Sequence, residues 1–108
     1  MKTLYRLALA PFAVLLLSGA ASAATGPEIF QAQKCNSCHK VTAAGIARLP
    51  NPDEEGKDLS HVGSTYDKKA IASFLLKKTE HNGEKHKKAF GGTTEELKTV
   101  ATWLESLK

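Results

Sequence analysis

The sequence predicts an all-α fold with three main helices in one small domain. Three segments carry helix-start signals, and the last of them repeats apolar residues at helical spacing. No segment alternates polar and apolar residues over the length of a strand, so we expect essentially no sheet.

The first 23 residues have the pattern of a secretory signal peptide. Lys2 and Arg6 form a positive start, residues 7–17 form an apolar run, and Ala21-Ser22-Ala23 forms an A-x-A cleavage site. The apolar run is too short to span a bilayer core of about 30 Å. We therefore expect residues 1–23 to be cleaved, which leaves a mature domain at residues 24–108 with no membrane span, located in the periplasm or outside the cell.

The first two helices are predicted from their caps. Thr25 is an N-cap with Glu28 three residues later and Pro27 in the first turn, and this helix runs toward residue 35. Asp67 caps a second helix that continues to about Lys78.

The third helix begins at Thr93 or Thr94, with two glutamates at its positive end. Its apolar residues fall on one face: Leu97, Val100, Ala101, Leu104 and Leu107. The loop at residues 42–64 is long for so small a domain and is expected only if it packs against something large.

A five-residue run, Cys35-Asn36-Ser37-Cys38-His39, carries the chemistry. C-x-x-C-H is the attachment pattern of a c-type haem. The two thiols lie one turn apart and can both form thioether bonds to one porphyrin, while the histidine can ligate the iron from below. Cys35 and Cys38 are the only cysteines of the chain, so no structural disulfide competes for them.

Three other kinds of site also use a C-x-x-C pair. A thioredoxin-like dithiol needs a βαβ context, which the sequence does not predict. A zinc site is suggested by the H-x4-H spacing of His81 and His86, but the 42 residues that separate Cys38 from His81 are far more than a zinc finger uses. A simple disulfide loop is the third. Haem attachment is favoured over all of them.

The order of these parts resembles the small class I c-type cytochromes of bacteria over nearly the whole mature chain. Phe30 and Trp103 resemble the aromatic contact between the family's first and last helices, and Gly56-Lys57-Asp58-Leu59 resembles its G-P-x-L loop, with Lys57 in place of the proline. The resemblance implies three helices wrapped around one covalently attached haem. It also implies that a carbonyl of this loop orients the imidazole of His39.

The departure from the family is the distal ligand. Most members use a methionine, but the only methionine here is Met1, which leaves with the leader. The iron is then bis-histidine, lysine-ligated or open on one side. His86 precedes the last helix where the family's methionine lies, although one extra residue separates it from the following phenylalanine. We favour His86 as the second metal ligand beside His39, with His81 as the alternative and His61 on the proximal side.

The charged residues limit the classes of partner that the chain is expected to bind. Removing Lys2 and Arg6 from the fifteen basic residues leaves thirteen against eleven acidic ones, a net charge of only +2, which gives no support to nucleic-acid binding. Five lysines cluster in sequence around the predicted distal loop: Lys77, Lys78, Lys85, Lys87 and Lys88. They form either an ordinary solvated surface or a docking ring for an acidic redox protein.

Two functions follow. The preferred one is a monomeric periplasmic electron carrier of low potential, with redox proteins as partners and no catalytic residues. The alternative is a haem-based gas sensor or small-molecule binder with an open or labile distal site. Peroxidase-like catalysis would need a distal acid–base group and an arginine, and Arg48 is the only arginine after the leader.

Overall fold

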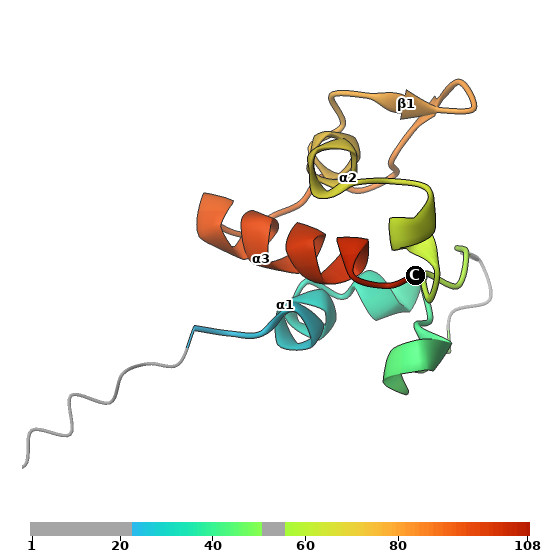
Figure 1. The fold of residues 1–108 in the computed structure, drawn as a ribbon, viewed down its shortest axis with the longest axis vertical. Coiled ribbons are helices and arrows are strands. Elements are labelled where there is room, and N and C mark those ends of the chain that lie inside the picture. The colour runs from blue at the N-terminus through green and yellow to red at the C-terminus, as the bar shows by residue number, and fades with distance from the viewer. Residues whose placement is uncertain (1–22, 51–55) are drawn as a thin grey trace, which may run out of the picture.

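The computed structural model describes residues 23–50 and 56–108, so the predicted leader, apart from Ala23, lies outside the described residues. Its main helices are α1 (Gly26–Ala32), α2 (Lys68–Leu75) and α3 (Thr94–Glu105). Both α1 and α2 pack against α3, from different sides (Figure 1). The predicted all-α fold with three main helices is confirmed.

The helix starts follow the predicted caps. Thr25 and Thr93 each form a complete capping box, with Glu28 and Glu96 respectively as the returning side chain. The Asp67 carboxylate accepts a hydrogen bond of 2.8 Å from the amide of Ala70 at the start of α2. The local sequence thus determines where all three helices begin.

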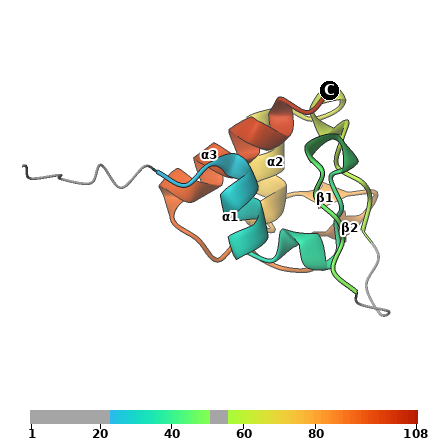
Figure 2. The ribbon, with the colours of Figure 1, turned by 90° about the horizontal axis from the view of Figure 1, so that it is seen from below.

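The core lies where α1 and α3 meet. Phe30 is 1% exposed, and its ring meets that of Trp103 edge-on, with centres 5.6 Å apart and planes at 69°. Figure 2 shows α1 lying across α3. The crossing is close, because a Cβ at Gly26 would lie 2.3 Å from the Cβ of Trp103. The predicted contact between Phe30 and Trp103 is therefore present, and Gly26 permits it.

The C-terminal end of α2 differs from the prediction. The helix ends at Leu75, short of Lys78, and Lys77 adopts a left-handed φ of 60°. The amide of Lys78 then donates to the carbonyl of Ser73 at 2.9 Å, which closes the helix end. The chain turns away from α2 into the segment that carries His81 and His86.

That segment begins with a short hairpin. Strands β1 (Glu80–His81) and β2 (Glu84–Lys85) pair in antiparallel register, and Asn82 and Gly83 form the turn with φ of 52° and 79°. Apart from an isolated bridge between Val41 and Ile46, no other strand pairing occurs in the described ranges. The expectation of essentially no sheet holds except for this two-residue pair.

The long loop is organised by short 3-10 turns at Thr42–Ala44 and Val62–Ser64, on either side of the undescribed residues 51–55. Gly63 fastens the second turn to the C-terminus, because its amide donates to the carbonyl of Leu107 at 2.7 Å. Within residues 23–50 and 56–108, no helix has the length and apolar character needed to cross a membrane.

Candidate functional site

The C-x-x-C-H run forms a tight turn directly after α1. Lys34 adopts a left-handed φ of 58°, and a 3-10 helix over Cys35–Ser37 follows. The amides of Cys38 and His39 both donate to the carbonyl of Cys35, at 3.2 and 2.9 Å. Both thiols are half-buried and not joined in a disulfide, and burial raises the pKa of the Cys35 thiol. The turn gathers the two thiols and the histidine within one short segment, as attachment to a single porphyrin requires.

His39 is held by the proximal loop, residues 56–60, which includes the run that resembles the family's G-P-x-L loop. Its Nδ1 lies 2.8 Å from the carbonyl oxygen of Lys57. A carbonyl can only accept, so Nδ1 carries the hydrogen and Nε2 keeps its lone pair for a metal. Burial lowers the pKa of His39 below its ordinary value, while the hydrogen bond to Lys57 opposes the shift and His86 adds to it. His39 is therefore favoured in the neutral form that ligates iron.

The imidazole of His86 is oriented in the same way as that of His39, by a backbone carbonyl. Its Nδ1 lies 2.5 Å from the carbonyl oxygen of Lys88, which again leaves Nε2 with the lone pair. The ring of Phe74 on α2 meets the His86 ring edge-on at 5.2 Å. The amide of Phe90 donates to the carbonyl of Leu75 at 2.9 Å, and this bond ties the segment after His86 to the end of α2.

The imidazoles of His39 and His86 lie close together, at a separation suited to one metal ion. The ring centres of His39 and His86 are 6.2 Å apart and the ring planes differ by 12°. A metal–imidazole bond is about 2 Å long and the ring centre lies about 1 Å beyond the nitrogen, so two imidazoles on one iron have centres about 6 Å apart. The observed separation fits an iron between them.

The other two histidines have partners elsewhere. The phenol oxygen of Tyr66 lies 2.5 Å from Nδ1 of His81, and the two rings meet edge-on at 5.3 Å. The Nδ1 of His61 lies 3.1 Å from the carbonyl oxygen of Lys108, at the C-terminal end of the chain. The structure thus brings together His39 and His86, and it gives His81 and His61 other roles.

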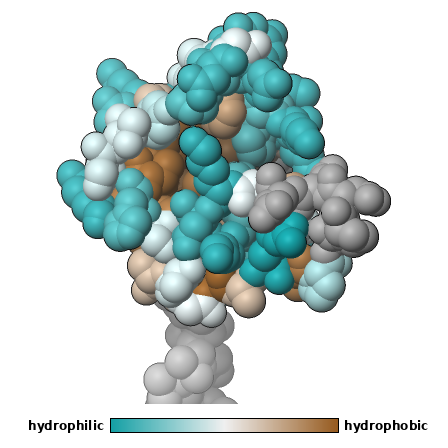
Figure 3. All heavy atoms as spheres, turned by 90° about the vertical axis from the view of Figure 1, so that its right-hand side faces the viewer, coloured by the Kyte–Doolittle hydropathy of each residue, from teal (hydrophilic) through white to brown (hydrophobic). Residues whose placement is uncertain are grey.

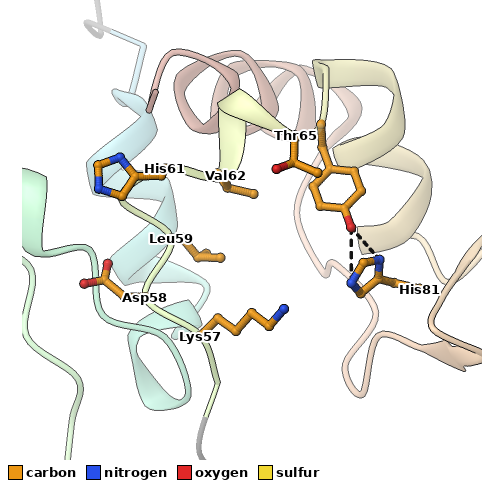
Figure 4. Close-up of a pocket in the computed structure, with 8 residues that line it drawn as sticks. Lys57, Asp58, Leu59, His61, Val62, Thr65 and His81 are labelled. Carbon is orange, nitrogen blue, oxygen red and sulfur yellow. Dashed lines mark hydrogen bonds between the residues drawn. The ribbon is translucent and has the colours of Figure 1, made fainter.

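A cavity of about 370 Å³ lies between the proximal loop and the hairpin. Leu59 and Val62 provide an apolar wall, and the side chain of Lys57 extends toward His81 across the opening (Figure 4). Arg48 is not among the described residues that line this cavity. The described lining does not include Cys35, Cys38, His39 or His86, so the cavity adjoins the haem motif only through Lys57, whose carbonyl accepts from His39.

Several apolar side chains around the site, including those of Leu59 and Val62, are only partly covered by the protein. Figure 3 shows apolar surface in a recess framed by hydrophilic side chains. The partly buried residues that pack against the core include Cys35, Leu59, Val62, Tyr66, Leu75 and Phe90. So small a domain gains stability if a large apolar group covers them.

The sequence comparison agrees with this geometry. Residues 23–108 match the cytochrome c family, which is more than half of the chain. The chain belongs to the cytochrome c family. Its cofactor is therefore one covalently attached haem c with its iron, and its general role is haem-based electron transfer. Neither a curated protein nor a solved structure matches this cytochrome.

The competing interpretations of the cysteines fit this cytochrome poorly. The described part of the chain contains no group of three or more His, Cys, Asp or Glu side chains placed to hold a metal ion, whereas a structural zinc site needs four ligands. A c-type haem needs only two protein ligands for its iron, because the porphyrin supplies the others.

Sequence reasoning missed two side chains at the site. Tyr66 follows the loop by a few residues and holds His81, and Asp58 forms a hydrogen-bonded junction beside Lys57. No motif in the sequence marks Tyr66 as a residue of the site. Asp58 had a signal, because it directly follows the residue whose carbonyl was expected to orient His39.

Proposed function

We propose that this cytochrome is an exported electron carrier of low potential, with His39 and His86 as the two axial ligands of its iron. The single observation that carries the proposal is the pair of imidazoles, 6.2 Å apart with nearly parallel planes. Both rings have Nδ1 bonded to a backbone carbonyl, which leaves both Nε2 atoms for a metal.

Each part of the chain has a defined task in this role. Cys35 and Cys38 tether the porphyrin, and the carbonyls of Lys57 and Lys88 fix the tautomer and the orientation of the two ligands. The partly buried side chains of Leu59 and Val62 would be covered by the bound porphyrin. The bound haem supplies a one-electron iron couple.

The low potential follows from the ligand pair. A thioether ligand raises the potential of histidine–methionine cytochromes, and the mature chain has no methionine to provide one. An imidazole on both sides lacks this effect. No catalytic residues are assigned, because the protein contributes ligands, burial and a docking surface rather than a reaction of its own.

Location and partners rest on the sequence. Residues 1–23 have the features of a secretory signal peptide, and export agrees with covalent haem attachment. Lys85, Lys87 and Lys88 are exposed around His86, and Lys77 reaches the carbonyl of Lys87 at 3.3 Å. These lysines would steer an acidic redox protein to the haem edge through weak, salt-sensitive contacts.

A visible spectrum with and without carbon monoxide tests the proposal. The purified holoprotein is expected to be six-coordinate and low-spin in both oxidation states, and its reduced spectrum should not change when carbon monoxide is added. Immediate carbon monoxide binding, or high-spin iron at neutral pH, would overturn bis-histidine ligation and favour the sensor function.

A further inference from the structure

The carboxylate of Asp58 accepts four hydrogen bonds although the side chain is exposed. The hydroxyl groups of Thr42 and Ser60 donate to it at 2.5 and 2.6 Å, and the amides of the same two residues donate at 3.3 and 3.0 Å. The side-chain hydrogen bonds from Ser60 and then Thr42 hold the pKa of Asp58 well below its ordinary value. An exposed carboxylate with four protein donors is not an ordinary solvated side chain.

The two bonds from Thr42 join the proximal loop, residues 56–60, to the haem-motif segment at residues 38–43, which contains His39, whereas the two bonds from Ser60 lie within the loop. Three further hydrogen bonds connect the loop to this segment: the amides of Gly56 and Leu59 donate to the carbonyls of Cys38 and Lys40 at 2.8 and 3.0 Å, and the amide of Ala43 donates to the hydroxyl of Ser60 at 2.9 Å.

The imidazole of His39 packs against the proximal loop. A Cβ at Gly56 would lie 2.6 Å from its ring, and the carbonyl of Lys57 accepts from its Nδ1 at 2.8 Å. Lys57 has no ring to fix its φ, so the direction of this carbonyl depends on the hydrogen bonds of its neighbours. Asp58 is the next residue, and it forms most of them.

We propose that Asp58 is a positioning residue for the proximal ligand: by clamping residues 56–60 to Thr42, it fixes the Lys57 carbonyl as the acceptor for His39. This inference rests on the proposed role of His39 as an iron ligand. The Asp58 carboxylate, labelled in Figure 4, is held by the hydroxyl groups of Thr42 and Ser60, so Asp58 acts on His39 through the backbone of the loop. An acceptor on the outer nitrogen of a metal-bound histidine raises the basicity of the ligand. A more basic imidazole stabilises the ferric state, so the clamp lowers the potential.

The test compares Asp58→Ala and Asp58→Asn in the haem-loaded protein. Hydrogen exchange of the His39 Nδ1–H is measured by NMR in the reduced, diamagnetic state, together with the midpoint potential. Asp58→Ala should remain low-spin, exchange this hydrogen about tenfold faster and move the potential upward, in line with the effect of removing an outer-shell partner. Asp58→Asn keeps one carbonyl acceptor for Ser60 and should give intermediate values.

The matched control is Asp67→Ala. It removes another carboxylate that caps a backbone amide, the Ala70 amide at the start of α2, but that carboxylate has no contact with the proximal loop. The control should lower stability and leave the exchange of the His39 hydrogen and the potential at wild-type values. Unchanged exchange and potential in Asp58→Ala, or equal changes in Asp67→Ala, would overturn the positioning role. A wild-type protein without low-spin, covalently bound haem would instead overturn the proposed function.

Discussion

The substitution His86→Ala should open the distal side of the iron and loosen the fold. An iron bonded to both His39 and His86 closes a loop of about 47 residues, and an ideal cross-link of that length stabilises a chain by about 4 kcal/mol. The variant should therefore lose up to about 4 kcal/mol of its free energy of unfolding, a large part of the about 5–15 kcal/mol typical of domains. It should also become high-spin and bind carbon monoxide rapidly.

The assay combines the visible spectrum with denaturant unfolding followed by the fluorescence of Trp103, the only tryptophan. His81→Ala is the matched control, since it removes an imidazole from the same segment and loses the hydrogen bond to Tyr66, about 1 kcal/mol, with the contacts to Asn82 and Phe74. It should stay low-spin, as should His61→Ala. A low-spin His86→Ala protein that becomes high-spin only when His81 is also removed would refute the reasoning, because His81 would then be a ligand or a substitute for one.

Four further outcomes are expected. The mature protein should weigh as the chain from Ala24 plus one haem, and the haem should resist extraction into acidic butanone; free extraction would contradict thioether attachment. Its midpoint potential should lie about 0.1 to 0.4 V below those of histidine–methionine relatives, within the ~0.8 V span that axial ligands control, and a value above about +0.2 V would contradict the ligand pair. Burial depresses the pKa of His39 in the folded state, so the unfolded chain binds more protons below its ordinary value of about 6.5, and stability should be lost as pH falls below that value. Because the metal holds the neutral form, the absorbance change to high-spin iron should begin well below pH 6.5, and an onset above it would contradict ligation. Finally, Gly56→Ala would place a Cβ 2.6 Å from the His39 ring and should reduce the yield of low-spin holoprotein, whereas Gly91→Ala, with its nearest neighbour at 3.3 Å, should not.

The helix starts could be predicted from the sequence because each depends on two or three neighbouring residues. Thr25 with Glu28 and Thr93 with Glu96 specify their caps locally. The end of α2 could not be predicted in the same way. It depends on a left-handed residue, and the sequence has a lysine at position 77 where glycine or asparagine would have signalled the turn.

The hairpin has one local signal in the sequence. Asn82-Gly83 is the dipeptide favoured in two-residue hairpin turns, and both residues have the positive φ that such a turn needs. The flanking residues Glu80 and Lys85 are polar, and residues 80–85 show no alternation of polar and apolar side chains, so this segment does not predict strands. The pairing forms because the turn dictates it, not because an apolar face is buried.

The spacing of residues in the sequence does not show which of His81 and His86 lies beside His39. Both lie in one segment of similar composition, and the imidazole of His86 is placed beside His39 by contacts with Phe74 and Lys88 that spacing does not reveal. The phenol of Tyr66, far away in sequence, then holds His81. Non-local contacts of this kind leave no periodic trace, whereas the cysteines and His39 lie within five residues and could be identified at once.

The shared hydrogen-bonding pattern of His39 and His86 bears directly on electron transfer. Both outer nitrogens donate to backbone carbonyls, of Lys57 and Lys88. A carbonyl oxygen, unlike a carboxylate, is not a base that takes up a proton when the iron is oxidised, so each imidazole keeps its hydrogen in both oxidation states. In the proposed bis-histidine site, both imidazoles would keep the same tautomer and the same partners in both oxidation states. An iron held in this way would exchange an electron without a coupled proton and with little rearrangement of its ligands, as the proposed carrier role requires.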